Sequence, residues 1–462
     1  MKNSNPFPTK KKKMRSAQLI PLSFLGAIII GTLLLMLPCA KAGEGSADFT
    51  TAMFTSTTSI CVTGLVVVDT FAYWTLFGKI VILILIQIGG FGVIAVSSIL
   101  ILKLGKKFSL WQSMLVQDAF NLNSISGVWH FLKVVFKGTF LVEMFGALLY
   151  MVRFIPKFGV LEGIWQSIFT SISAFCNAGI DILGPDSLIS YQTDPYILFV
   201  TMFLIVMGGL GFVVWLDMYR TIRKGIKWKY SPVIIWKHFG EHTKLVIVLT
   251  LSLILIGAVA VFGIEYNNPE TLGKLSVGDK VVNSVFQSVT FRTAGFAAVP
   301  QNGLMESTSF LGCILMFIGG SPVGTAGGVK TVTFFVVILN AVSFIRNRKE
   351  NVAFGRKITS SMIHKASAIV IVGFLITSFL LILLMVVNRV SLVDGMYETF
   401  SATATVGLSR GLTSTLNLAG RWVIIVAMYL GRIGPISMAL FFNYRSEGKN
   451  KVSYADGHYF IG

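Results

Sequence analysis

The stretch Phe54-Thr-Ser-Thr-Thr-Ser-Ile-Cys-Val-Thr-Gly64 decides the fold, because three variants of it follow later in the chain. They read Phe169-Thr-Ser-Ile-Ser-Ala-Phe-Cys-Asn-Ala-Gly179, Phe286-Gln-Ser-Val-Thr-Phe-Arg-Thr-Ala-Gly295 and Tyr397-Glu-Thr-Phe-Ser-Ala-Thr-Ala-Thr-Val-Gly407. Each is rich in Ser and Thr and ends in a small-residue turn with glycine. Similar segments at a nearly constant spacing indicate a repeated structural unit. We therefore predict four consecutive repeats.

Apolar segments flank every one of these turns. Hydrophobic residues make up 54% of the 462 residues and charged residues only 13%, which is far from the composition of a soluble domain. Most of the apolar segments match the roughly 20 residues that a membrane-spanning helix needs. They cover residues 16–37, 79–102, 131–154, 196–218, 245–264, 310–344, 366–387 and 422–442. The prediction is an all-α membrane protein of four helix/pore-loop helix/helix repeats with eight spanning helices.

The basic residues indicate how the chain crosses the membrane. They cluster at alternate ends of the apolar segments, within residues 2–15, 103–137, 220–244, 346–365 and 445–451. The positive-inside rule places these clusters, and hence both termini, in the cytoplasm. The net charge of +19 is thereby explained by topology, and no nucleic-acid partner is expected. The predicted layout is a basic N-terminus (1–15), repeats at 16–105, 128–220, 243–346 and 364–445, and a cytoplasmic C-terminus (446–462).

The polar turns are too short to cross a bilayer, yet they lie between apolar segments. Non-helical backbone is tolerated at membrane depth only where protein covers it or water lines it. Four re-entrant turns converging on one hydrated axis satisfy this condition. Their carbonyl groups could replace the hydration shell of a potassium ion, and glycine permits the backbone angles that aim them inward. The rival interpretation is four interfacial loops without a pore.

A second motif follows each turn within the next apolar segment. It reads Gly89-Gly90-Phe91-Gly92, Gly208-Gly209-Leu210-Gly211, Gly319-Gly320-Ser321-Pro322 and Gly431-Arg432-Ile433-Gly434. For the first two copies, close packing of small residues is the simpler explanation. Arg432 replaces a glycine and is costly at mid-membrane, so it faces either a hydrated pathway or an ion-pair partner such as Glu143.

The third copy lies in an apolar segment that is too long for a single span, so we predict a break there. The glycines and proline of residues 319–328 disfavour a continuous helix. The stretch faintly resembles a phosphate-binding loop, but Val329 stands where that motif requires glycine. We expect a mobile plug instead, formed by Gly319, Gly320, Gly324, Gly327, Gly328 and Lys330 together with Arg432.

These motifs resemble the Trk/Ktr/HKT superfamily of potassium transporters, and most closely its KtrB branch, the membrane subunit of a potassium uptake system. The resemblance covers nearly the whole chain. Its most specific segments are Val62-Thr-Gly-Leu-Val-Val-Val-Asp-Thr70, Arg292-Thr-Ala-Gly-Phe296, Thr405-Val-Gly-Leu408 and Gly431-Arg-Ile-Gly-Pro435.

The resemblance implies a pseudo-tetrameric pore of the potassium-channel kind, with K+ as substrate and an intramembrane loop at 319–328 as its gate. K+ would bind the backbone carbonyls of Val62, Thr63, Gly64, Asn177, Ala178, Gly179, Thr293, Ala294, Gly295, Thr405, Val406 and Gly407. It also implies a homodimer in the bacterial cell membrane, a separate KtrA-like cytosolic nucleotide-binding subunit, and Na+ as an activator or symported ion. No cofactor and no enzymatic activity are expected.

Three alternatives stay open at this stage. Only the fourth turn reads Thr-Val-Gly, so a sodium or unselective monovalent cation transporter of the same fold competes. In relatives that carry sodium the first filter glycine can be serine, so the resemblance implies that Gly64 favours potassium. A symporter for an organic solute would need broken helices in inverted repeats, whereas the sequence predicts one interrupted second helix in parallel repeats. The basic stretch 220–244 either docks the regulatory subunit or contacts only anionic lipid.

Overall fold

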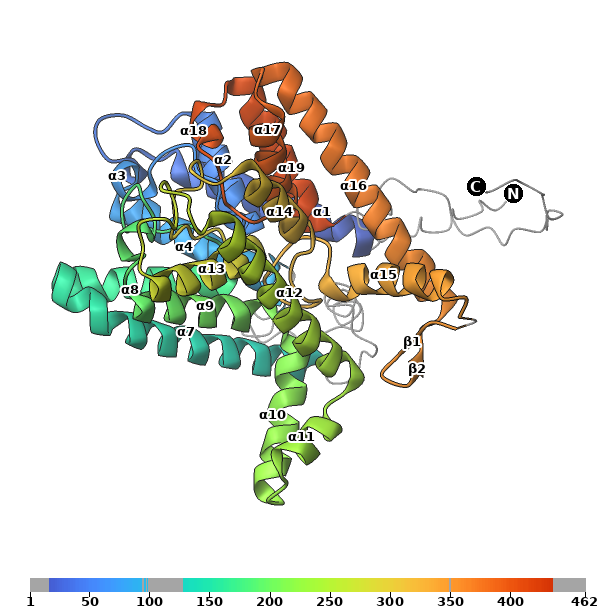
Figure 1. The fold of residues 1–462 in the computed structure, drawn as a ribbon. Coiled ribbons are helices and arrows are strands. Elements are labelled where there is room, and N and C mark those ends of the chain that lie inside the picture. The colour runs from blue at the N-terminus through green and yellow to red at the C-terminus, as the bar shows by residue number, and fades with distance from the viewer. Residues whose placement is uncertain (1–15, 94, 97, 99–127, 349, 435–462) are drawn as a thin grey trace, which may run out of the picture.

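The computed structural model describes residues 16–93, 95–96, 98, 128–348 and 350–434. The described chain is predominantly helical, and the same three-part unit occurs four times (Figure 1). Each unit has a first helix, a shorter polar helix that we call the pore helix, and a second helix. The first helices are α1 (Ser16–Leu35), α7 (Val128–Phe158), α12 (Glu241–Glu265) and α16 (Ser360–Asn388). The pore helices are α2 (Phe49–Cys61), α8 (Val160–Cys176), α13 (Val277–Phe291) and α17 (Leu392–Thr403).

The second helices differ more among the repeats. They are α4 (Leu76–Phe91), α9 (Pro195–Gly209), the pair α14 (Glu306–Phe317) and α15 (Thr331–Ile345), and α19 (Leu418–Ile433). Short elements connect the units: η1 (Pro38–Ala40), α3 (Thr70–Tyr73), η2 (Ile189–Tyr191), α10 (Phe212–Lys227), α11 (Pro232–His238), β1 (Val352–Ala353), β2 (Arg356–Lys357) and α18 (Leu412–Thr415). The two short strands pair antiparallel, which the all-helical prediction did not include.

The repeats are arranged in a closed circle. Within each repeat the first helix packs on the pore helix, and the second helix packs on the pore helix of the next repeat. The pairs between repeats are α4 with α8, α9 with α13, α14 with α17, and α19 with α2. The last pair joins the fourth repeat to the first, so the four pore helices surround a common centre.

The second helices break at the second glycine motif. The predicted break of the third repeat lies between α14 and α15, as expected. The prediction of only one interrupted second helix is wrong, however, because α9 continues into α10 through a bend of 99°. Gly211 makes this bend possible with a φ of 91°, and Gly92 and Gly434, with φ of 85° and 84°, end α4 and α19 at the matching place. The glycine motif therefore stops the helix in every repeat.

By length and composition, four described helices could each cross a membrane, and a fifth span arises if α9 and α10 are counted together. The four are the first helices of the repeats. Among the remaining second helices, α4, α14 and α15 are shorter apolar helices of 10–17 residues, and α19 has 16 residues, so the count of eight spans stays a prediction. Several of the predicted segments lie outside the described residues. They are the N-terminus (1–15), the C-terminus (446–462), Pro435, the ends of repeats one and four, and most of the basic cluster at 103–137.

Candidate functional site

All four pore helices end in the same unusual turn. The residue two positions before the glycine adopts the left-handed conformation, with φ of 55° at Val62, 60° at Asn177, 66° at Thr293 and 51° at Thr405. Such angles are uncommon for residues other than glycine. The glycines themselves have φ of 101° (Gly64), 64° (Gly179), 82° (Gly295) and 98° (Gly407). A strained turn that recurs in four sequences is held by its surroundings and marks a functional backbone.

The four glycines form a closed ring. A Cβ atom built on Gly64 would lie 2.4 Å from the carbonyl oxygen of Ala178 in the second repeat. The same construction brings Gly179 to Ala294, Gly295 to Val406 and Gly407 to Thr63, at 2.6, 2.6 and 2.3 Å. Each glycine therefore abuts the carbonyl that precedes the next glycine, and the series returns to its start. Only glycine, which has no Cβ atom, allows the backbones to come this close. The close contacts bring the four predicted triplets together.

The carbonyl oxygens of the triplets have no hydrogen-bond donor among the described residues. The triplets are Val62-Thr-Gly64, Asn177-Ala-Gly179, Thr293-Ala-Gly295 and Thr405-Val-Gly407, and none of their carbonyl oxygens accepts a hydrogen bond from a described residue. Nearly all of these residues are buried. Buried backbone carbonyls are normally paired with protein or water. A ring of unpaired carbonyl oxygens is suited to bind a cation.

Hydroxyl groups of the pore helices hold the turns in place. Thr58 and Ser401 accept hydrogen bonds from the backbone N–H of Gly64 and Gly407, at 2.9 and 3.1 Å. In the other two repeats, Ser173 and Thr290 donate to the carbonyl of the residue after the glycine, at 2.5 and 2.7 Å. These roles were not predicted individually, although the Ser/Thr-rich composition of each stretch was the visible signal.

A second set of contacts was not predicted from the sequence. In three repeats a glycine of the first helix faces a serine of the pore helix, and the pairs are Gly31 with Ser56, Gly146 with Ser171, and Gly257 with Ser288. Each serine donates to a carbonyl three residues before that glycine, at 2.6–2.8 Å. The glycine lets the two helices approach, and the hydroxyl fixes their depth. The recurring serine two residues after Phe could have revealed this pattern.

The broken helix of the third repeat places its loop against the ring. Thr325 donates to the side chain of Asn177 at 2.9 Å, and the N–H of Gly327 donates to the hydroxyl of Thr293 at 3.2 Å. A Cβ on Gly327 would lie 1.9 Å from the hydroxyl oxygen of Thr405. The loop therefore contacts three of the four turns at their left-handed residues. This packing requires that residue 327 has no side chain, as glycine provides.

The loop is fixed to its surroundings mainly by backbone contacts. Gly319 packs against Gly327 and Gly328, and Gly320 packs against Ala326. A Cβ on Gly324 would lie 3.0 Å from the carbonyl oxygen of Gly208. The N–H groups of Ser321 and Thr325 donate to Gly209 and Gly208, at 3.0 and 3.2 Å. The predicted gate glycines thus lie together, beside the turns of the second, third and fourth repeats.

Two cationic side chains support the same loop. Arg432 donates to the carbonyl of Thr325 at 2.7 Å and to the carbonyl of Gly89 at 2.6 Å, so it connects the loop to the end of α4. Lys330 donates to the carbonyl of Ala326 at 2.6 Å. The alternative of an ion pair between Arg432 and Glu143 is wrong, because the described residues contain no such pair and Glu143 accepts hydrogen bonds from Gln87 at 3.0 Å.

The opposite side of the ring opens into an acidic vestibule. A cavity of about 440 Å³ touches all four ring glycines and is lined by Asp69 and Asp181, among others. Burial raises the pKa of Asp181 to about 6; hydrogen bonds from Ser187 and Leu183 oppose this effect, and the charge of Asp69 adds to it. Carboxylates at this mouth attract cations toward the ring.

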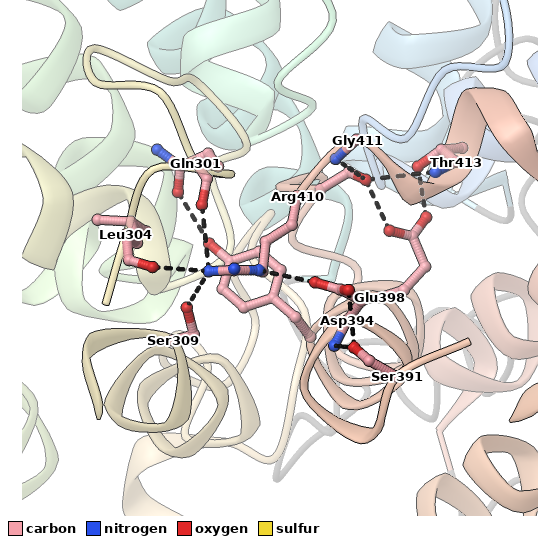
Figure 2. A network of polar contacts seen from close by, with 11 residues as sticks. Gln301, Leu304, Ser309, Ser391, Asp394, Glu398, Arg410, Gly411 and Thr413 are labelled. Atoms are coloured by element: carbon pink, nitrogen blue, oxygen red, sulfur yellow. Dashed lines mark hydrogen bonds and ion pairs between the residues drawn. The ribbon is translucent and has the colours of Figure 1, made fainter. Parts of the chain in front are cut away.

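The loop that follows the fourth turn is anchored to two repeats (Figure 2). Arg410 forms an ion pair with Asp394 at 2.9 Å and donates to the carbonyl of Leu304 and the hydroxyl of Ser309, at 2.9 and 2.6 Å. The carboxylate of Glu398 accepts from the hydroxyls of Ser409 and Thr413. The network connects the fourth turn to its own pore helix and to the outer loop of the third repeat. It was not predicted from the sequence.

Comparisons with known proteins agree with one another. The family model described as TrkH, cation transport protein, matches residues 6–453. The chain is 39% identical to Ktr system potassium uptake protein B of Bacillus subtilis, with 96% of each chain covered. It is 35% identical to the potassium/sodium uptake protein NtpJ of Enterococcus hirae, with 93% of each covered. The crystal structure of the potassium transporter TrkH from Vibrio parahaemolyticus matches with a TM-score of 0.74 at 15% identity, covering 95% of this chain and 87% of that one.

Proposed function

The chain belongs to the TrkH family of cation transport proteins, and from this premise we propose that it takes up potassium ions across the cell membrane through the ring of glycine triplets. The family consists of transporters and not of enzymes. Potassium is the ion named in the relatives from Bacillus subtilis and Vibrio alginolyticus.

The ring of unpaired carbonyl oxygens is the observation that carries this proposal. Carbonyl rings bind potassium by replacing its hydration shell. The four pore helices end at the triplets or one residue before them, so the negative ends of their dipoles point at the ring and stabilise a cation there. The acidic vestibule supplies cations from the outer side. These features together favour a selectivity filter over four unrelated interfacial loops.

The loop at 319–328 is proposed as the gate of this pathway. It touches three turns of the ring, and its glycines allow a change of backbone conformation with few side chains to repack. Arg432 and Lys330 place positive charge on the far side of the ring from the vestibule. A closed loop would therefore oppose a cation both by filling space and by electrostatic repulsion.

We also propose the partners that accompany this function. The name "Ktr system" given to the relatives indicates more than one component, which supports a separate cytosolic nucleotide-binding subunit of the KtrA type. A homodimer, activation by Na+ or symport of it, and cytoplasmic placement of both termini complete the proposal.

Replacing Gly64 with Ser tests the filter assignment. A side chain at this position meets the carbonyl of Ala178 and must also accept a φ of 101°, so the ring is expected to deform and the preference for potassium over sodium to fall. Uptake of potassium, sodium and rubidium would be compared in proteoliposomes. Gly43→Ser is the matched control, because Gly43 has a φ of 89° and a Cβ atom built on it would meet nothing within 4 Å.

An unchanged potassium-to-sodium ratio in Gly64→Ser protein that inserts normally would contradict the filter assignment for the first repeat. A second candidate function is transport of both potassium and sodium. It is favoured by the relative named as a potassium/sodium uptake protein and by the single Thr-Val-Gly triplet. Comparable uptake of both ions by the parent protein would support it.

A further inference from the structure

Helices α10 and α11 form an arm that leaves the helical bundle (Figure 1). From Tyr219 to Gly240 almost every residue of the arm is exposed or half-buried, and α11 has no buried residue. The two helices pack on each other through Ile235, which a Cβ on Gly225 would meet at 2.6 Å, and through stacked rings of Tyr230 and His238. The arm is therefore a helical hairpin whose surface is largely uncovered by the described residues.

The direction of the arm follows from the bend at Gly211. Helix α9 has 15 residues and is about 22 Å long, so it covers most of a hydrocarbon core of about 30 Å. The bend of 99° then turns α10 nearly perpendicular to α9. Asp217 accepts from the N–H of Gly240 at 2.9 Å and thereby holds the base of the arm at the start of α12. The arm consequently extends sideways, along the membrane plane, near the basic cytoplasmic side.

Two adjacent faces of α10 have different chemistry. Tyr219, Ile222 and Ile226 recur at the spacing of one helical face and are 60%, 38% and 72% exposed. The neighbouring face carries four basic residues, Arg220, Arg223, Lys224 and Lys227. Exposed aromatic residues follow in the turn and in α11, and they are Trp228, Tyr230 and Trp236. This combination is typical of helices that lie in a membrane interface.

The basic residues of the arm have no ion-pair partner among the described residues. Residues 218–240 contain six Lys and Arg and no Asp or Glu, and none of these six forms an ion pair within the described part of the chain. We propose that the α10–α11 arm is a membrane-surface anchor that binds anionic phospholipid headgroups, with its apolar face in the hydrocarbon boundary. A soluble protein partner fits less well, because it would leave the apolar stripe beside the bilayer unexplained.

The base of the arm connects directly to the loop that we propose as the gate. The N–H of Phe212, the first residue of α10, donates to the carbonyl of Val323 at 2.9 Å. A Cβ on Gly211 would lie 2.4 Å from the carbonyl oxygen of Pro322. Lipid held by the arm would thus act on the loop through this contact. This effect on the loop rests on the proposed function, whereas the binding of lipid to the arm does not rest on it.

Quenching of tryptophan fluorescence by brominated lipid tests the anchor. The full chain is reconstituted in phosphatidylcholine vesicles with phosphatidylglycerol, and either lipid is brominated in turn. The difference between the parent and Trp228→Phe isolates the signal of Trp228. Brominated phosphatidylglycerol is expected to quench it more strongly per mole. Each basic residue near an anionic surface enriches anionic lipid locally about fivefold. The double variant Arg223→Gln/Lys227→Gln should therefore lower the preference for phosphatidylglycerol over phosphatidylcholine by up to ~25-fold.

The control variant carries Arg346→Gln and Arg348→Gln, which remove two exposed cytoplasmic charges elsewhere. It should keep the phosphatidylglycerol preference at Trp228. Equal quenching by both lipids in the parent, no quenching by either, or an equal loss in the control would overturn the proposal. Loss of a co-purifying soluble subunit in the Arg223/Lys227 variant, with lipid preference intact, would assign the arm to a protein partner instead. None of these readouts requires transport, so they fail independently of the proposed function.

Discussion

Arg432 contributes both hydrogen bonds and a positive charge at the proposed gate loop, and two substitutions separate these contributions. It donates to the carbonyl of Thr325 in the loop and to the carbonyl of Gly89 in α4, and it also places a positive charge beside the proposed ion path. Arg432→Ala removes both the hydrogen bonds and the charge. Arg432→Lys keeps the charge but loses the planar fork that reaches two carbonyls at once.

The size of the effect follows from these contacts. A hydrogen bond from a charged donor contributes about 1.5–3 kcal/mol, and only the bond to Thr325 belongs to the loop. Its loss shifts the equilibrium between closed and open loop by about 10- to 100-fold. Removing a unit charge about 4 Å from a cation lowers the barrier by a further ~1–4 kcal/mol. We therefore expect Arg432→Ala to raise the maximal uptake rate at least tenfold, and Arg432→Lys to fall between it and the parent.

The assay is the initial rate of potassium uptake in proteoliposomes over a range of concentrations, normalised to inserted protein. The apparent affinity should change little, because the triplets are untouched. If Arg432→Ala inserts normally and its maximal rate is at or below that of the parent, the arginine neither closes the loop nor repels the ion. A Lys variant that equals the parent would assign the whole effect to charge.

Three other predictions concern the loop, the vestibule and the Arg410 network. Deleting residues 323–326 should raise the maximal uptake rate more than Arg432→Ala does, with apparent affinity unchanged; a rate at or below the parent's would make the loop a structural bend. The Asp181 carboxylate is charged above its pKa of about 6 and neutral below it, so lowering the outer pH from 7 to 5 should weaken apparent potassium affinity about twofold, and Asp181→Asn should abolish this dependence. Arg410→Ala should destabilise the protein by about 2–3 kcal/mol, seen as a lower thermal midpoint in detergent. The exposed pair of Arg356 and Glu241 is the control, and Arg356→Ala should cost under about 1 kcal/mol.

The repeat and its ring were predictable because they depend on local sequence. The glycines of the four turns recur at a nearly constant spacing, each after a similar Ser/Thr-rich stretch. A backbone angle that only glycine adopts readily requires glycine at that position, and this requirement can be recognised in the sequence. The break between α14 and α15 was predictable for the same reason, since a segment of about 35 apolar residues exceeds one span. These features need no knowledge of which distant residues meet.

The features that were missed depend on contacts between distant segments. Arg432 was recognised as costly, but its partners are backbone carbonyls of Thr325 and Gly89, and a carbonyl carries no sequence signal. Glu143 was considered as an alternative ion-pair partner because a sequence pattern reveals opposite charges and not backbone acceptors. The bend at Gly211 was missed because the motif Gly-Gly-Leu-Gly is also compatible with a continuous, closely packed helix. The glycine motif is compatible with a break at Gly211, but the sequence does not indicate the direction that α10 takes after the break.

The closed circle of repeats has an evolutionary consequence. In an assembly of four identical subunits, one mutation appears in every quarter, so an arginine at the level of Arg432 would bring four buried charges, and a loop such as residues 319–328 would occur four times. Here a single polypeptide carries all four quarters, and each can mutate alone. The three positions that match Arg432 remain glycine, at Gly90, Gly209 and Gly320. One chain that carries all four quarters thus allows selection to alter the proposed gate in one quarter while the ring geometry stays fourfold.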